Sequence, residues 1–243
     1  MVNKKLKEKE LISASNISSA LKRLANKKMA SKALSFFKTS PGQYGHGDKF
    51  LGIRVPKVRE IAAKSKPKIK ELNKLLLSPW HEERLVALII LNNYYKQANK
   101  EEKIFLENFY LKNLNKVNNW DLVDSSAHQI LGERLAKNKK LFIKLLESSN
   151  LWYRRVAIVG TYKTIKENNF SLIIKAAEKI IKNKEKEDLI HKATGWMLRE
   201  VGKRDKKTLI DFLKKYSFIM PRTMLRYAIE KMSKKERQAW LKK

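Results

Sequence analysis

A helix of mixed character is predicted by the stretch Val117-Asn118-Asn119-Trp120-Asp121-Leu122-Val123-Asp124-Ser125-Ser126-Ala127-His128-Gln129-Ile130-Leu131. Its polar start suits a helix N-cap, and Asp121 in the first turn suits the helix dipole. The apolar residues recur at helical spacing and predict a buried stripe: Val123, Ala127, Ile130 and Leu131. Asp124 is the exception, because it lies beyond the first turn and one turn after Trp120. A carboxylate among apolar neighbours is costly unless a partner compensates it, so Asp124 is the first candidate functional residue.

The remainder of the chain also reads as helices. Two amphipathic patterns lie between Ile17 and Phe37, and further helical patterns follow one another from Pro56 onward. Ser78 is predicted as an N-cap with Pro79 at the first helical position, and Asn150 is predicted to start another helix. No period-2 alternation is long enough for a sheet. The sequence therefore predicts an all-α fold.

Small residues mark a repeat within this helical pattern. Each member lies early in an apolar helix, at steps of 40, 30, 36 and 35 residues: Ala87, Ala127, Ala157, Ala193 and Ala228. Such periods are typical of a curved α-solenoid, in which one helix of each pair lines a concave face. Chance is the alternative, since alanine is common in helices. We expect residues 15–243 to form one solenoid domain and residues 1–14 to be a flexible basic N-terminus.

The charge of the chain favours a polyanionic partner. Its 55 Lys and Arg against 24 Asp and Glu give a net charge of +31, which nucleic acid would match most simply. A general lysine bias is the alternative, because only 12 of the 55 basic residues are Arg.

Several classes of site are excluded by composition. The chain has no cysteine, so it has neither disulfides nor thiolate sites, and its four histidines lack metal-ligand spacing. We expect no metal and no cofactor. No apolar run has the length of a membrane span and no signal-peptide pattern follows the basic start, so we expect a soluble, cytoplasmic protein without membrane contact.

The glycine-rich segment 39–52 is predicted to be a loop, and no strand precedes it as a nucleotide loop would require.

Aromatic and basic residues are interleaved on the aligned helices. Lys192 and Trp196 share a helix face, as do Trp152 and Arg155. Cations for phosphates and flat rings for sugars and bases are what a nucleic-acid groove needs. The candidate DNA-binding residues are Arg155, Lys192, Arg199 and Arg226. The alternative, that tryptophans are core residues capped by arginines, is favoured for Trp80 and Trp152 but not for Trp120 and Trp196, which stand near charged residues.

The chain resembles the bacterial AlkD family of alkylpurine DNA glycosylases, built from HEAT-like repeats, from about residue 18 to residue 235. The resemblance rests on four motifs in order: Phe50-Leu51-Gly52-Ile53-Arg54-Val55-Pro56, Trp120-Asp121-Leu122-Val123-Asp124, Trp152-Tyr153-Arg154-Arg155-Val156-Ala157 and Lys192-Ala193-Thr194-Gly195-Trp196-Met197-Leu198-Arg199-Glu200. It implies a HEAT-like solenoid with Asp124 as the catalytic aspartate. It also implies that Trp120 and Trp196 flank the sugar of the damaged nucleotide and that Arg155 binds the DNA backbone.

The implied activity is excision of positively charged N3- and N7-alkylated purines, such as 3-methyladenine and 7-methylguanine, from duplex DNA by a monomeric enzyme. A fixed carboxylate would stabilise an oxocarbenium-like sugar and orient water. The alternative is a non-catalytic HEAT-like module that binds nucleic acid or an acidic protein, which would have no use for Asp124 in a basic groove. A carboxylate kept for function is a local cost, so the stability of Asp124→Asn is expected to hold or improve.

Overall fold

The computed structural model describes residues 11–242. Of the predicted flexible start, 1–14, the first ten residues lie outside the described residues. The other four are part of the fold. Leu11 forms an isolated parallel bridge with Ser65, and the Ala14 N–H at the start of the first helix donates to Glu71 Oε2 over 3.0 Å.

Every regular element of these described residues is helical apart from two isolated β-bridges, which confirms the all-α prediction. The chain forms two compact units, Met1–Leu122 and Val123–Lys243, and we describe each by itself. The single solenoid domain expected for 15–243 stays a prediction. None of the helices in the described part is long and apolar enough to cross a membrane.

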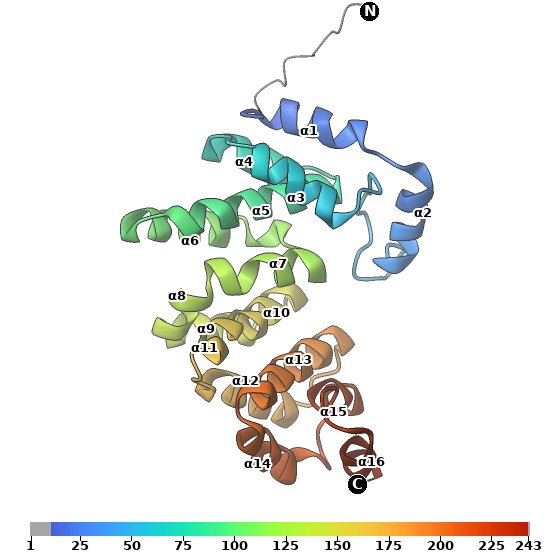
Figure 1. Cartoon of the computed structure of the whole chain (residues 1–243), viewed down its shortest axis with the longest axis vertical. Helices are drawn as coiled ribbons and strands as arrows, with labels where there is room; N and C mark the ends of the chain where they lie inside the picture. The colour runs from blue at the N-terminus through green and yellow to red at the C-terminus, as the bar shows by residue number, and fades with distance from the viewer. Residues whose placement is uncertain (1–10, 243) are drawn as a thin grey trace, which may run out of the picture. The chain divides into compact units, whose positions relative to one another are not determined.

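The first unit holds α1 (Ala14–Arg23), α2 (Lys27–Phe36), α3 (Val55–Lys64), α4 (Ile69–Leu76), α5 (His81–Gln97), α6 (Lys100–Lys112), the 3-10 helix η1 (Leu114–Lys116) and the first turn of α7 (Trp120–Ile130). Helix α5 is its centre, because α3 and α4 both pack against it and α1 contacts all three (Figure 1). The amphipathic α4 shows why: its apolar residues Leu72, Leu75 and Leu76 all fall on one face and are buried.

The second unit holds the rest of α7 and α8 (Gly132–Lys137), α9 (Lys139–Leu146), α10 (Leu151–Gly160), α11 (Tyr162–Lys166), α12 (Ser171–Lys182), α13 (Asp188–Arg204), α14 (Lys206–Tyr216), α15 (Arg222–Ala228) and α16 (Lys234–Lys242). Helix α10 packs on α13, and α13 packs on α15 (Figure 1). These three helices carry Ala157, Ala193 and Ala228, all buried, so the alanine repeat marks helices that do pack in succession. Gly195 lets α13 and α15 approach closely, since a Cβ there would lie 2.4 Å from the Met224 carbonyl oxygen.

One predicted helix start is wrong and another is confirmed. Helix α5 begins at His81, two residues after the expected position, and Ser78 Oγ accepts the N–H of its N-cap residue Trp80. The helix starts later because the backbone of residues 79–81 pairs with Lys49, which donates its N–H to the Pro79 carbonyl oxygen and accepts the N–H of His81. Asn150 caps α10 as predicted, with Oδ1 accepting the Trp152 N–H at 2.8 Å.

The glycine-rich loop is held in place by one carboxylate of α5. Glu82 accepts the backbone N–H groups of Leu51, Gly52 and Ile53 at 2.8–3.1 Å. Gly52 has a φ of +77°, and a Cβ there would lie 2.3 Å from the Asn26 carbonyl oxygen. Only glycine fits this position. The end of the loop therefore packs between α5 and the start of α2.

Candidate active site

Helix α7 is the element that carries both Trp120 and Asp124, one turn apart. Its predicted core stripe is confirmed, since Val123, Ala127 and Ile130 are fully buried. The Trp120 N–H at its start donates to Asn119 Oδ1 over 2.8 Å. The apolar stripe fixes the rotation of the helix and leaves Asp124 at the edge of that stripe.

Asp124 is held by a two-point ion pair within the second unit. Arg155, on α10, donates Nε to Asp124 Oδ1 over 2.9 Å and Nη2 to Oδ2 over 2.8 Å. Its third nitrogen, Nη1, donates to the Leu189 carbonyl oxygen over 2.5 Å. Arg155 is only 5% exposed, whereas the Asp124 side chain keeps 21% exposure. A bidentate pair of this kind fixes the carboxylate plane, and the side chain stays partly exposed.

This pair changes the expectation for stability. Breaking a buried ion pair leaves the remaining charge uncompensated and typically costs about 3–5 kcal/mol, less where the pair is partly exposed. Asp124→Asn should therefore lower stability, contrary to what the sequence suggested. The contact of Arg155 with the DNA backbone stays a prediction.

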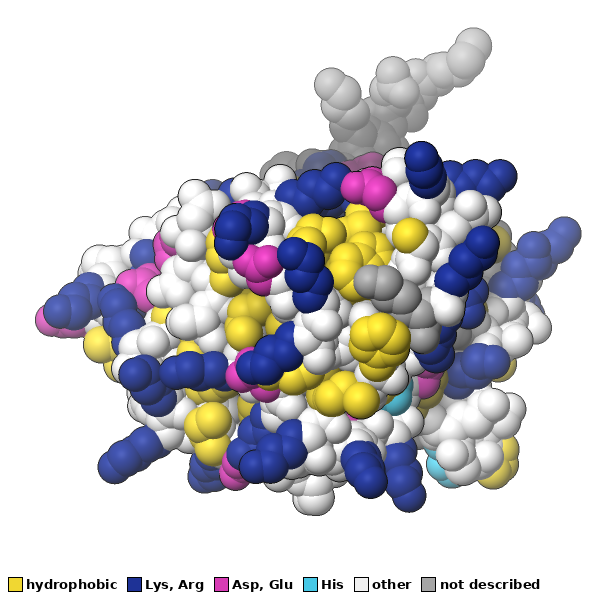
Figure 2. Space-filling model, turned by 90° about the horizontal axis from the view of Figure 1, so that it is seen from below, with side chains coloured by type: hydrophobic (Ala, Val, Ile, Leu, Met, Phe, Trp, Pro, Cys, Tyr) yellow, Lys and Arg dark blue, Asp and Glu magenta, His cyan; other side chains and the backbone are white. Residues whose placement is uncertain are grey.

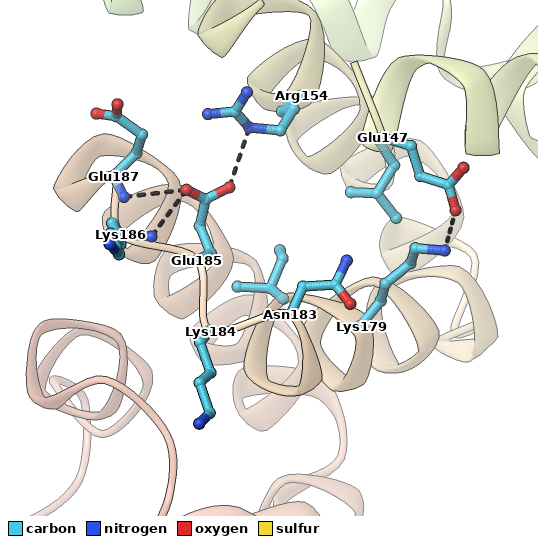
Figure 3. A pocket seen from close by; sticks show the side chains of 10 residues that line it. Glu147, Arg154, Lys179, Asn183, Lys184, Glu185, Lys186 and Glu187 are labelled. Carbon is cyan, nitrogen blue, oxygen red and sulfur yellow. Dashed lines mark hydrogen bonds and ion pairs between the residues drawn. The ribbon is translucent and has the colours of Figure 1, made fainter. Parts of the chain in front are cut away.

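A neighbouring ion pair offers a comparison. Arg154, the residue before Arg155, pairs with Glu185 at 3.0 Å, and both side chains are largely buried. Figure 3 shows this pair at the edge of a pocket of about 430 Å³, with Lys179 and Glu147 paired across from it. Glu185 also accepts the N–H groups of Lys186 and Glu187. Arg154 Nη1 donates to the carbonyl oxygens of Ser148 and Ser149, so this second ion pair of the same unit is tied to neighbouring backbone.

Trp196 lies on α13 in the same unit as Asp124 and is half-buried. Its indole lies 6.3 Å from the ring of Tyr162, which in turn lies 5.2 Å from the ring of His128. His128 is one turn after Asp124 on α7. An aromatic row thus leads from the α7 face that carries Asp124 to Trp196.

Trp120 is half-buried in the first unit, against the end of α2. Its indole stacks on Phe37 with ring centroids 5.3 Å apart and meets Phe36 edge to face at 5.7 Å. Phe36 is 64% exposed. The three rings line a pocket of about 450 Å³ whose walls are mainly apolar.

The other predicted DNA-binding residues differ in their surroundings. Lys192 pairs with Asp188 at 2.7 Å, Arg199 pairs with Glu200 and Glu230, and Arg226 is exposed on α15. The face seen in Figure 2 carries many Lys and Arg side chains and few acidic ones. Among residues 11–242, no group of three or more His, Cys, Asp or Glu side chains has the geometry of a metal site.

The comparisons with known proteins give the family and the fold of the chain. The family model described as DNA alkylation repair enzyme matches residues 17–232. The chain belongs to this family. A solved structure, "Predicted DNA alkylation repair enzyme from Enterococcus faecalis", has the same fold with a TM-score of 0.67 and 21% identity, covering 86% of this chain and 97% of that one. No curated protein matches the chain.

As a member of the DNA alkylation repair enzyme family, the chain has a role in repair of alkylated DNA. The sequence had singled out Asp124 and Arg155, and the structure brings them together. It did not single out Phe36, Phe37 or Tyr162 as site residues, because Phe37 and Tyr162 fit the apolar helical patterns and are expected there as core residues. The one signal in the sequence was the pair of adjacent aromatic residues at the end of α2, of which the structure leaves Phe36 exposed.

Proposed function

We propose that this protein is a DNA glycosylase that excises positively charged N3- and N7-alkylated purines from duplex DNA, with 3-methyladenine and 7-methylguanine as model substrates. One observation carries the proposal: in a strongly basic chain of a DNA alkylation repair family, a partly exposed Asp124 is held at two points by a buried Arg155. A carboxylate in a DNA-binding protein repels phosphates, so its retention needs a function.

The chemistry requires little beyond such a group. Alkylation at N3 or N7 already makes the purine a cation, so no general acid has to protonate it. The electron pair of the glycosidic bond leaves with the base, and positive charge develops on the sugar. Asp124 stabilises that charge and orients a water molecule toward the anomeric carbon, where the new carbon–oxygen bond forms as the water releases a proton to solvent. Because Arg155 fixes the carboxylate beforehand, no reorganisation is needed in the transition state.

The indoles of Trp120 and Trp196 are proposed to contact the sugar of the damaged nucleotide. An indole face attracts a developing cation, and each of these two rings is half-buried against other aromatic rings in its own unit. Lys192, Arg199 and Arg226 are proposed to contact the DNA backbone, and the enzyme is proposed to act as a cytoplasmic monomer without a cofactor.

The test is single-turnover release of free base from a duplex with one 7-methylguanine. Asp124→Asn keeps the shape of the side chain but removes its charge, so base release should fall by roughly 100-fold or more. The melting temperature should be measured on the same preparation. Glu185→Gln is the matched control, because it neutralises the neighbouring ion pair of the same unit.

Both variants should lose stability, but only Asp124→Asn should lose base release per folded molecule. Release at the wild-type rate from folded Asp124→Asn would refute the catalytic assignment. A wild-type protein that binds duplex DNA without releasing base would favour the non-catalytic module instead.

A further inference from the structure

His81 is the centre of a buried ionic network in the first unit. It is the first residue of α5 and is 2% exposed. Its Nε2 lies 2.7 Å from Asp121 Oδ2 and its Nδ1 lies 3.4 Å from Asp48 Oδ2. Asp48, from the glycine-rich loop, also accepts from Arg84 at 2.7 Å and from Asn119 Nδ2 at 3.3 Å. Two carboxylates, an arginine and a histidine are therefore enclosed together.

The charges of this network balance when His81 is protonated. Burial by itself lowers the pKa of His81, but the charge and hydrogen bond of Asp121 and the hydrogen bond of Asp48 outweigh it and raise that pKa to about 9, against the opposing charge of Arg84. Both ring nitrogens then donate, one to each carboxylate. The pKa of Asp48 is lowered: burial opposes this, but hydrogen bonding with His81 and the charge of Arg84 prevail.

Two routes lead from His81 to Trp120. The first is the backbone, since Asp121 and Asn119 are the residues on either side of Trp120, and both are bonded into the network. The second is a set of stacked rings: His81 lies 4.9 Å from Phe37, and Phe37 stacks on Trp120. The indole is therefore fixed both at its backbone and at its face.

We propose that His81 is a positioning residue for Trp120, holding the start of α7 and the indole in place by bridging the carboxylates of Asp48 and Asp121. Buried ion pairs contribute little net stability compared with apolar residues of similar volume, but they can restrict geometry. This role rests on the proposed function of Trp120 at the damaged nucleotide. It also gives the glycine-rich loop a purpose, because Asp48 comes from that loop.

The direct test is ¹⁹F NMR of protein labelled with 5-fluorotryptophan. Among the five tryptophans, the Trp120 resonance is assigned by its absence in Trp120→Phe. His81→Gln should shift or broaden the Trp120 resonance while those of Trp196 and Trp240, in the second unit, stay unchanged. His46→Gln is the matched control, since His46 is an exposed histidine of the same loop. A Trp120 resonance in folded His81→Gln that matches wild type would overturn the proposal.

If His81→Gln fails to fold, two other measurements decide. Asp121→Asn removes the negative charge that His81 binds on α7 and should move the same resonance. In the wild-type protein, the Trp120 resonance should move as pH rises, with a midpoint near 9, where His81 loses its proton. A resonance that keeps its wild-type position in folded Asp121→Asn and does not move on titration through pH 9 contradicts the bridging role.

Base release then tests whether the position matters for the reaction. In an active wild type, His81→Gln should slow single-turnover release by about 10- to 100-fold with unchanged affinity for undamaged duplex, because small displacements of a positioned group are costly. A shifted Trp120 resonance with wild-type release would refute the role in the reaction. The NMR result does not depend on activity, so it stands even if the glycosylase assignment fails.

Discussion

At the scale of single residues, the meaning of Asp124 depends on Arg155. The sequence predicted a costly carboxylate, and the structure shows that two guanidinium nitrogens of Arg155 compensate it. The third nitrogen donates to the Leu189 carbonyl oxygen, so all three have acceptors within the protein. The geometry assigns Arg155 a partner inside the fold, while the resemblance implies a partner on DNA. These two roles make different predictions.

The first prediction concerns Arg155→Ala. Because the guanidinium holds Asp124, base release should fall at least about 10-fold, as for other lost positioning groups. The dependence of DNA affinity on salt should stay as in wild type, since no nitrogen of Arg155 points to solvent without a protein acceptor. Arg226→Ala, which removes an exposed cation, is the comparison and should flatten the salt slope by about one contact. Flattening by Arg155→Ala would support the phosphate contact instead.

The second prediction concerns pH and His81. Its folded pKa of about 9 lies above the ordinary 6.5, so its contribution to stability is complete below pH 6.5 and is lost as pH rises through 9. The urea midpoint of wild type should therefore fall between pH 6.5 and pH 9.5 by more than that of His81→Gln. Equal falls in both proteins would show that other groups cause the change.

At the scale of elements, the loop 39–52 determines where α2 lies. Glu82 fixes the end of the loop, and Gly52 lets the loop pass against the start of α2. Phe36 and Phe37 lie at the other end of this helix. Neither contact follows from local sequence. The glycines predicted a loop, but the carboxylate that holds it belongs to Glu82 of α5, 30 residues after Gly52.

The third prediction compares two glycines of this loop. Gly52 and Gly42 have nearly the same φ, +77° and +78°. A Cβ added at Gly52 would lie 2.3 Å from the Asn26 carbonyl oxygen, whereas a Cβ added at Gly42 would have no atom within 4 Å. Both alanine variants should lose about 1 kcal/mol or more to the left-handed conformation. Gly52→Ala should lose a further 1–3 kcal/mol or so by displacing α2. Urea unfolding of both proteins measures the difference, and equal losses would mean that α2 adapts without cost.

At the scale of the whole molecule, the net charge of +31 is the dominant property. Only part of it is cancelled locally, since pairs such as Lys192 with Asp188 and Arg199 with Glu230 occupy some of the predicted DNA-binding residues. If the positive charge forms a DNA-binding surface, the affinity for DNA should depend strongly on salt. If it reflects only a lysine bias, no such dependence is expected.

The fourth prediction is therefore a steep salt dependence. If six or more phosphates are contacted, affinity for an undamaged duplex should fall by about 10³-fold or more between 50 and 200 mM salt. Fluorescence anisotropy at several salt concentrations measures the slope. An affinity that hardly changes with salt would leave the charge without a role in DNA binding.

The sequence by itself determined the all-α fold and the core stripe of α7, and it singled out Asp124 as a candidate, because hydrophobic periodicity and an isolated carboxylate are local properties. It placed the start of α5 wrongly, since the competing partner of that backbone, Lys49, is distant along the chain. Only the tertiary structure showed that Asp124 pairs with Arg155 and that His81 bridges two carboxylates. The physical reason is the same in each case: the balance of charges inside a core depends on which side chains meet there, and residues 31 to 40 apart meet only through packing.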